Sequence, residues 1–139
     1  MDEILIVSDA TSVLSEVRSA LEDDDTEIRE LMVGELVRDE VDEAPPDLVV
    51  TDLQVGSMGG VAICMDLRLE ESGERLPHVP VLILLDRRAD VFLARRSGAE
   101  GWLVKPLDSL RLRRAARILI DGGTYHDESY KPLPLPSEV

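Results

Sequence analysis

The sequence predicts an α/β fold in which a parallel sheet is covered by helices on both faces. Short apolar segments alternate five times with segments that carry apolar residues at helical spacing, and this alternation is typical of parallel sheets built from β-α units. Most of the apolar segments are continuous, as expected for strands that are buried on both faces. With 139 residues and a hydrophobic content of 44%, the chain is large enough for one domain with its own core.

Five segments are predicted as strands. The aliphatic run 4–7 is followed by a serine and an aspartate, and the run 47–52 follows a proline pair and ends in an aspartate. Residues 80–85 form the most hydrophobic run of the chain, and residues 101–104 lead into a Lys-Pro pair. Residues 26–32 alternate only partly between apolar and polar side chains, so this segment is predicted as an edge strand.

The helices are predicted from capping residues and from helical spacing. Thr11 or Ser12 can cap the first helix through a side-chain hydroxyl, Gly34 opens the second, and Asp108 can cap the last. Gly98 is expected to end the fourth helix. Helices are therefore expected within residues 11–21, 34–44, 61–70, 87–97 and 108–121.

The domain is predicted to span residues 1–121. Gly122 and Gly123 follow the last helical segment and are expected to stop it. Residues 122–139 are largely polar and contain three prolines, so they are predicted to form an extended or mobile tail.

Several features indicate a cytoplasmic protein. The chain has one cysteine, Cys64, which excludes an intrachain disulfide and fits a reducing compartment. No apolar run approaches the roughly 20 residues that are needed to span a bilayer, so no membrane contact is expected. The N-terminal residues carry neither a basic flank nor a long apolar region, which argues against a secretory signal.

Charge is distributed unevenly along the chain. The formal net charge is −14, which argues against nucleic acid as a partner. Residues 1–86 carry 22 acidic and 5 basic side chains (−17), whereas residues 87–121 carry 4 acidic and 9 basic side chains (+5). Two interpretations remain: ordinary solvated arginine faces on the late helices, or a basic docking surface on an acidic body. The docking surface would consist of Arg87, Arg88, Arg95, Arg96, Arg111, Arg114 and Arg117.

Three polar residues fall at the ends of predicted strands. They are Asp9 after the first strand, Asp52 at the end of the third and Lys105 after the fifth. Parallel strands bring such residues together at the carboxyl edge of the sheet, where ligands bind. With the segment Gly98–Pro106, the chain resembles the receiver domain of bacterial two-component response regulators over about residues 3–121. That resemblance implies a flavodoxin-like (βα)5 doubly wound parallel sheet with strand order 2-1-3-4-5.

The resemblance also implies a role for each of these residues. Asp52 would accept a phosphoryl group as an aspartyl phosphate, and Lys105 would contact a phosphoryl oxygen. Asp9, Asp52 and the backbone carbonyl of Gln54 would bind Mg²⁺ through oxygen. In the family, the peptide bond between this lysine and the proline that follows it is often cis. From the residues alone, the aspartates could equally be turn or capping residues, and the lysine an ordinary surface residue.

The chain departs from the family pattern near this site. Ser8 stands where the family usually has a second acid, so a bound Mg²⁺ is expected to be held weakly. Leu85 stands where the family has the Thr or Ser of the hydroxyl switch, and it cannot donate a hydrogen bond. Asp86 follows at a position that is usually small, where it would either repel phosphate or partly replace the lost carboxylate. Trp102 stands where the family often has the switch Tyr or Phe, but the larger indole favours a packed or partner-facing aromatic over a switch.

Two functional hypotheses follow from the resemblance. The first is a stand-alone, atypical response regulator in phosphorelay signal transduction, a phosphoprotein that accepts a phosphoryl group on Asp52 from a histidine kinase or another phosphodonor. It would signal to an unknown target protein through the late basic helices, a face that also allows a homodimer. The second is a pseudo-receiver that is never phosphorylated and acts as a constitutive interaction module. An enzyme is not expected: Gln54 replaces the second Asp of haloacid dehalogenase phosphatases, and no G-x-G-x-x-G follows the first strand.

Overall fold

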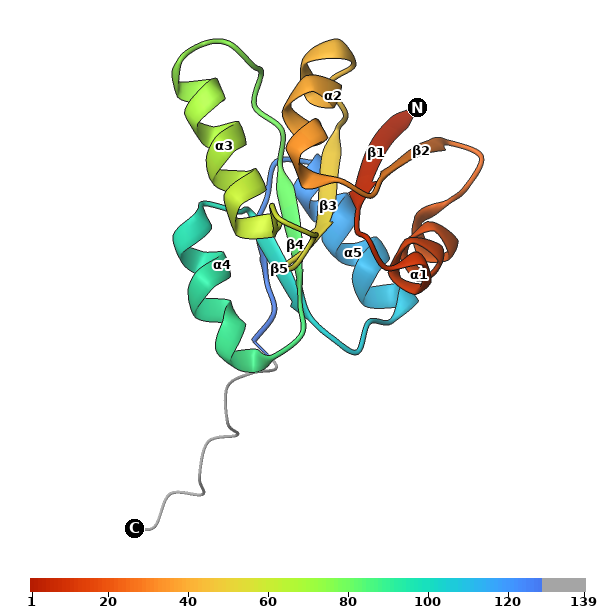
Figure 1. The fold of residues 1–139 in the computed structure, drawn as a ribbon. Coiled ribbons are helices and arrows are strands. Elements are labelled where there is room, and N and C mark those ends of the chain that lie inside the picture. The colour runs from red at the N-terminus through yellow and green to blue at the C-terminus, as the bar shows by residue number, and fades with distance from the viewer. Residues whose placement is uncertain (129–139) are drawn as a thin grey trace.

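The computed structural model describes residues 1–128 of the chain and shows one parallel sheet of six strands with order β2-β1-β3-β4-β5-β6 (Figure 1). The predicted order 2-1-3-4-5 is therefore confirmed, with one strand added. The strands are β1 (Asp2–Val7), β2 (Thr26–Leu31), β3 (Leu48–Asp52), β4 (Val81–Leu85), β5 (Gly101–Val104) and β6 (Tyr125–His126).

Five α-helices and two short 3-10 helices connect the strands. The predicted fourth helix is divided, because a 3-10 turn precedes its α-helical part, and the second helix begins in the same way. No helix of the described residues is long and apolar enough to cross a membrane. The helices are α1 (Thr11–Leu21), η1 (Gly34–Leu36), α2 (Val37–Glu43), α3 (Gly60–Ser72), η2 (Arg88–Asp90), α4 (Val91–Ser97) and α5 (Ser109–Ile120).

The sheet separates two apolar layers. Successive side chains of a strand point to opposite faces, so Leu5 and Val7 of β1 belong to one core cluster, whereas Ile4 and Ile6 belong to the other. The first cluster includes buried residues of α2, α3 and α4, and the second includes those of α1 and α5. Helices thus cover both faces of the sheet (Figure 1), and β3 and β4 are buried along their whole length.

Helix ends confirm two of the predicted signals and correct a third. The Asp108 carboxylate accepts from the Arg111 backbone N–H (2.9 Å), and Gly98 ends α4 in the left-handed conformation, with φ of 84°. The predicted hydroxyl cap of the first helix is wrong. Thr11 and Ser12 already lie inside α1, so neither is the N-cap. The N-cap is Ala10, whose side chain has no group that can form a hydrogen bond.

The C-terminal segment corrects the prediction of a tail that begins at residue 122. Tyr125 and His126 form β6, which pairs in parallel with Gly101 and Trp102 of β5, and Asp127 is buried. The folded part of the chain therefore extends at least to residue 127. Residues 129–139, which include the predicted proline-containing part of the tail, lie outside the described residues.

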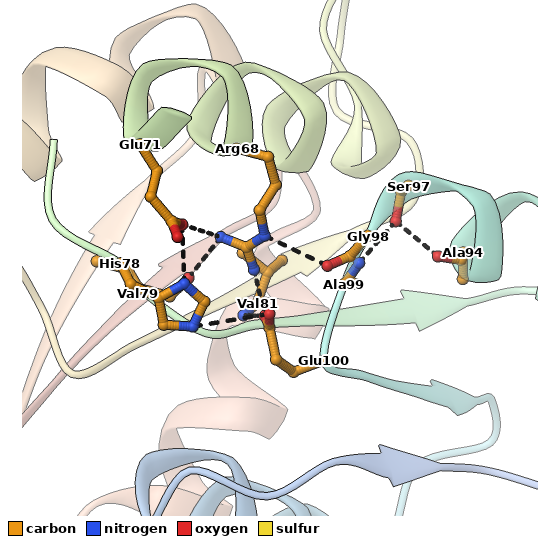
Figure 2. Close-up of polar contacts among 10 residues, drawn as sticks. All are labelled: Arg68, Glu71, His78, Val79, Val81, Ala94, Ser97, Gly98, Ala99 and Glu100. Atoms are coloured by element: carbon orange, nitrogen blue, oxygen red, sulfur yellow. Dashed lines mark hydrogen bonds and ion pairs between the residues drawn. The ribbon is translucent and has the colours of Figure 1, made fainter. Parts of the chain in front are cut away.

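A polar network joins α3 to the starts of β4 and β5 (Figure 2). The Arg68 guanidinium donates to the carbonyl oxygens of Val79 (3.0 Å) and Gly98 (3.3 Å) and forms an ion pair with Glu100. The Glu100 carboxylate also accepts from the Val81 backbone N–H at 2.9 Å. Because these groups are partly buried, each depends on the others for its hydrogen bonds. The charged side chains of the network are Arg68, Glu71, His78 and Glu100.

Replacing Arg68 by alanine is expected to lower the free energy of unfolding by about 2–4 kcal/mol, because it leaves a partly buried carboxylate and two carbonyls without their donor. Urea unfolding measures this change. Arg18→Ala is the matched control, since Arg18 forms its ion pairs with Glu22 and Glu30 at the surface and its loss should cost less than about 1 kcal/mol. Equal losses in the two variants would contradict a structural role for the network.

Candidate functional site

The carboxyl ends of four adjacent strands bring the candidate site together. Asp52 is the last residue of β3, and it is buried. Ser8 directly follows β1, Asp86 follows β4 and Lys105 follows β5. The order β1-β3-β4-β5 in the sheet makes these strand ends neighbours, although they are far apart in sequence. This topology places Asp52 and Lys105 at the carboxyl edge of the sheet, where the sequence predicted them.

Both oxygens of the Asp52 carboxylate accept a hydrogen bond. The Lys105 ammonium donates to Oδ1 at 2.6 Å, and the Ser8 hydroxyl donates to Oδ2 at 2.6 Å. The Lys105–Pro106 peptide bond is cis, as in many members of the family it resembles. A carboxylate this deeply buried is stable in its charged form only with such partners. The buried Asp52 carboxylate is therefore stabilised by one cation, the Lys105 ammonium, and one neutral donor, the Ser8 hydroxyl.

Lys105 is shared between two carboxylates. Its ammonium donates to Oδ1 of Asp86 at 2.9 Å as well as to Asp52. Burial opposes the charge of the ammonium, but the hydrogen bonds and charges of Asp52 and Asp86 outweigh this effect and raise the pKa of Lys105. The sequence left two roles open for Asp86, repulsion of phosphate or a metal ligand, and the structure adds that its carboxylate accepts a hydrogen bond from Lys105.

Asp9 does not contact Asp52 by a hydrogen bond in this arrangement. Its side chain is exposed and accepts from the Gly56 backbone N–H at 2.9 Å, so it is tied to the loop after β3. Within residues 1–128, no group of three or more His, Cys, Asp or Glu side chains is arranged to hold a metal ion. Mg²⁺ prefers oxygen ligands such as those of Asp9, Asp52 and the Gln54 carbonyl. Ser8 supplies no carboxylate, so the site has one acid fewer than it would have with an acid at position 8.

The two predicted switch positions are both buried. Leu85 is fully buried in the core beneath α3 and α4 and has no polar atom to offer the site. Trp102 is also buried, and the His126 ring stacks on it with a centroid distance of 4.1 Å and an interplanar angle of 4°. The Arg95 guanidinium lies 5.7 Å from the centroid of the indole. The interpretation of Trp102 as a packed aromatic fits this position.

The seven arginines predicted as a docking surface are not equally available. Arg111 forms an ion pair with the buried Asp127, and Arg117 forms one with Asp2 of β1. Because β3 and β4 separate β1 from β5 in the sheet, Arg117 lies away from α4. Arg87 also forms an ion pair, with the buried Asp90, although its side chain is exposed. The remaining arginines are exposed: Arg88, Arg95 and Arg96 on η2 and α4, and Arg114 on α5.

Sequence patterns missed two partnerships at the site. Ser8 was interpreted only as the loss of an acid, yet it donates to Asp52. Asp86 was placed near the site without a partner, yet it bonds to Lys105. Residue spacing does not predict which side chains at a sheet edge are in contact. The available signal for the Ser8–Asp52 hydrogen bond was that a serine and an aspartate lie at the ends of adjacent strands.

Comparisons with known proteins agree with the fold. A family model described as response regulator receiver domain matches residues 4–117. The transcriptional regulatory protein DegU of Brevibacillus brevis is 31% identical over 94 residues, which are 66% of this chain and 38% of that protein. The DNA-binding dual master transcriptional regulator RpaA of Synechocystis sp. is 29% identical over 122 residues, 86% of this chain and 49% of that protein.

A solved structure gives the same picture. The signal receiver domain of a signal transduction histidine kinase from Syntrophus aciditrophicus has 25% sequence identity and a TM-score of 0.77, and the match covers 88% of this chain and 92% of that chain. The chain spans about half or less of the length of the curated relatives described above.

The shared lysine leads to a prediction about pH. A pKa of Lys105 above the ordinary value of 10.5 means that its pairing stabilises the fold fully below pH 10.5, and that this contribution is lost as pH rises through the raised pKa. Asp86→Asn should lower the pKa of Lys105, because it removes one of the two carboxylates. NMR titration of the Lys105 side chain measures this shift. Asp121→Asn, which removes an equal charge beside Arg117, should leave it unchanged; equal values in wild type and Asp86→Asn would contradict the shared lysine.

Proposed function

Because this chain belongs to the response regulator receiver domain family, we propose that it accepts a phosphoryl group on Asp52 and transmits this signal through protein contacts. Receiver domains act in two-component signalling, typically as modules without enzymatic turnover. One observation carries the proposal: a buried carboxylate at the end of β3 has the Lys105 ammonium at 2.6 Å. An incoming phosphoryl group would meet a nucleophile and a counter-charge at the same place.

The chemistry proposed for Asp52 is nucleophilic. A carboxylate oxygen attacks the phosphorus of a phosphohistidine or of an acyl phosphate, an O–P bond forms, and the bond from phosphorus to the donor's nitrogen or oxygen breaks. Lys105 neutralises charge on the phosphoryl oxygens. The Ser8 hydroxyl orients the other carboxylate oxygen through its 2.6 Å hydrogen bond. The donor is a histidine kinase or a small acyl phosphate.

Asp9, Asp52 and the backbone carbonyl of Gln54 are proposed to hold Mg²⁺, which would neutralise further charge on the phosphoryl group when bound. Ser8 contributes a neutral hydroxyl where an acid would add a third charge, so the affinity for the cation is proposed to be low. The exposed Asp9 side chain would exchange its hydrogen bond to Gly56 for the cation.

A second function has its own support. Both oxygens of Asp52 are already hydrogen-bonded, and Asp86 occupies the lysine that a phosphoryl group would need. These contacts favour a pseudo-receiver, a constitutive interaction module in which Lys105 and Ser8 only stabilise a buried carboxylate. We place phosphoryl acceptance first because Asp52 and Lys105 keep their positions, and because the competing carboxylate, Asp86, has a half-exposed side chain that can turn away.

The output of the domain is proposed to be a contact with a target protein. Exposed arginines gather on η2 and α4 around the exposed ring of Phe92, over which Arg96 lies at 5.1 Å. This combination of positive charge and an exposed aromatic suits an acidic protein surface, not nucleic acid or a membrane. The proposed unit is an atypical receiver of the cytoplasm that includes β6, and a homodimer is compatible with it.

Phosphoryl acceptance is tested by incubating the protein with acetyl phosphate and Mg²⁺ and measuring intact mass. We expect wild type to gain the mass of one phosphoryl group and Asp52→Asn to gain none, because the amide is not nucleophilic. Asp66→Asn, a carboxylate of α3 that pairs with Arg38, is the control and should still gain it. If wild type gains nothing from acetyl phosphate or from its cognate kinase, the pseudo-receiver is the correct function.

The weak metal site leads to a second prediction. Ser8→Asp should raise the affinity for Mg²⁺ by about tenfold or more, because it adds a carboxylate beside Asp52. Without Mg²⁺ the variant should be less stable than wild type, since the two carboxylates repel each other. Calorimetric titration and thermal unfolding with and without Mg²⁺ measure these effects.

Ser12→Asp is the matched control, because Ser12 is exposed on α1 and the added charge lies on the surface of that helix. Unchanged Mg²⁺ affinity in Ser8→Asp would show that position 8 does not limit the cation.

A further inference from the structure

The edge of β5 is closed by the chain's own C-terminal segment. Without it, β5 would be the last strand of the sheet and would present unpaired backbone groups along one side. The backbone N–H of Tyr125 donates to the Glu100 carbonyl at 3.1 Å, and that of Asp127 donates to the Trp102 carbonyl at 3.2 Å. These contacts are backbone hydrogen bonds of the kind by which an added strand docks on a sheet edge.

Side chains make this docking specific for the sequence of the segment. The Asp127 carboxylate accepts from the Val104 backbone N–H at 2.8 Å and forms an ion pair with Arg111 of α5. One residue earlier, the His126 ring lies flat on the indole of Trp102. The edge of β5 therefore recognises an extended segment in which a planar ring precedes a carboxylate.

The two ends of this docking surface are held in different ways. Before the start of β5, Glu100 is fixed by its ion pair with Arg68 and its hydrogen bond to Val81 (Figure 2). At the end of β5, the Asp127 carboxylate accepts from the Val104 backbone N–H and from the Arg111 guanidinium. Contacts outside the segment thus hold Glu100 in place, whereas Asp127 holds the segment at the end of β5.

A helix-terminating turn directs the segment onto β5. Gly122 N–H donates to the Leu119 carbonyl (3.0 Å), and Gly123 N–H donates to the Ile118 carbonyl (2.8 Å). This is the Schellman pattern, which requires a left-handed residue at Gly122, where φ is 94°. Beyond Gly122 and its two chain neighbours, no atom lies within 4 Å of the position that a Cβ would take on Gly122, so the backbone conformation is what opposes a side chain there. The turn is a hinge: if the helix continues through it, the segment leaves β5.

From these contacts we propose that residues 124–127 are an exchangeable strand, and that the β5 edge of one copy binds the same segment of a second copy. Each copy carries both the surface and the matching segment, so exchange keeps every contact and requires only that the hinge opens. The strand pairs through two residues alone, so its release leaves the rest of the sheet intact. This dimer does not depend on phosphorylation of Asp52.

The hinge gives the first test, by size-exclusion chromatography with light scattering on the full chain. Gly122→Ala should shift the equilibrium away from the closed monomer by about tenfold, because an alanine is disfavoured in the left-handed conformation, and the dimer fraction should rise with protein concentration. Gly56→Ala is the matched control. Gly56 also has positive φ (49°) and free space around it, but it lies in the loop after β3 and should remain as monomeric as wild type.

The latch gives the second test. Adding Asp127→Ala to Gly122→Ala removes the carboxylate that holds the segment in both the closed and the exchanged form. Both forms should therefore give way to an open monomer in which the segment is undocked. The single tryptophan reports on the same event: acrylamide should quench Trp102 weakly in wild type and in the exchanged dimer, and strongly in the double variant. A dimer that persists in the double variant would show association through another surface and would overturn the proposal, as would a Gly122→Ala variant that stays monomeric.

Hydrogen exchange of the wild type keeps the proposal testable if Gly122→Ala does not fold. The amide protons of Tyr125 and Asp127 should exchange faster than those of β1 and β3, because the segment opens while the sheet stays folded. Exchange at the rate of global unfolding would mean that the segment is an integral strand, and strand exchange would be excluded.

Discussion

The ion pair between Lys105 and Asp52 is the contact on which the carboxyl edge of the sheet depends. An aspartate at the end of a fully buried strand is stable only if its charge is compensated, and Lys105 Nζ compensates it at 2.6 Å. Lys105 directly follows β5, and β4 lies between β5 and β3 in the sheet, so the lysine side chain reaches across the end of β4 to Asp52. The strand order and the apolar layers on both faces provide this geometry. The rest of the site is arranged around an anion that the fold has to hold.

Two residues alter the charge balance around this pair. Ser8 removes a carboxylate from the side of the site next to β1, and Asp86 adds one at the end of β4. Compared with the family pattern, the number of acids near Asp52 is thus unchanged. One acid is missing on the proposed cation side, at Ser8, and one is added on the lysine side, at Asp86. A neutral hydroxyl replaces charge where Mg²⁺ would bind, and a carboxylate occupies the ammonium that a phosphoryl group would use. Whether Asp86 gives up Lys105 is one physical difference between the proposed phosphoryl acceptance and a permanent interaction module.

The sequence predicted the elements that have a periodic or capping signal. Continuous apolar runs located β3, β4 and β5, partial alternation located the edge strand β2, and Asp108 located the start of α5. β6 was missed because a strand of two residues has no periodicity, and its register depends on Asp127 reaching Val104 in three dimensions. The cap of α1 was predicted at Thr11 or Ser12, one or two residues after the true N-cap, Ala10. A threonine inside the first turn resembles a cap in sequence.

Candidate site residues were predictable as positions, not as contacts. Asp52 and Lys105 were found because buried parallel strands deliver their last residues to one edge. The hydrogen bond from Ser8 and the sharing of Lys105 with Asp86 depend on rotamers and on distances between neighbouring strands. No spacing rule in a single sequence specifies these quantities, so the sequence left the function of Asp86 open and the structure gave it a partner.

The rate of phosphoryl uptake from acetyl phosphate in Asp86→Asn, compared with wild type, tests the central claim most directly. If Asp86 and a phosphoryl group compete for Lys105, the variant should react about tenfold faster or more, because a charge-assisted hydrogen bond worth about 1.5–3 kcal/mol no longer has to be broken first. Asp121→Asn should react at the wild-type rate. An Asp86→Asn variant that reacts no faster than wild type would contradict the account.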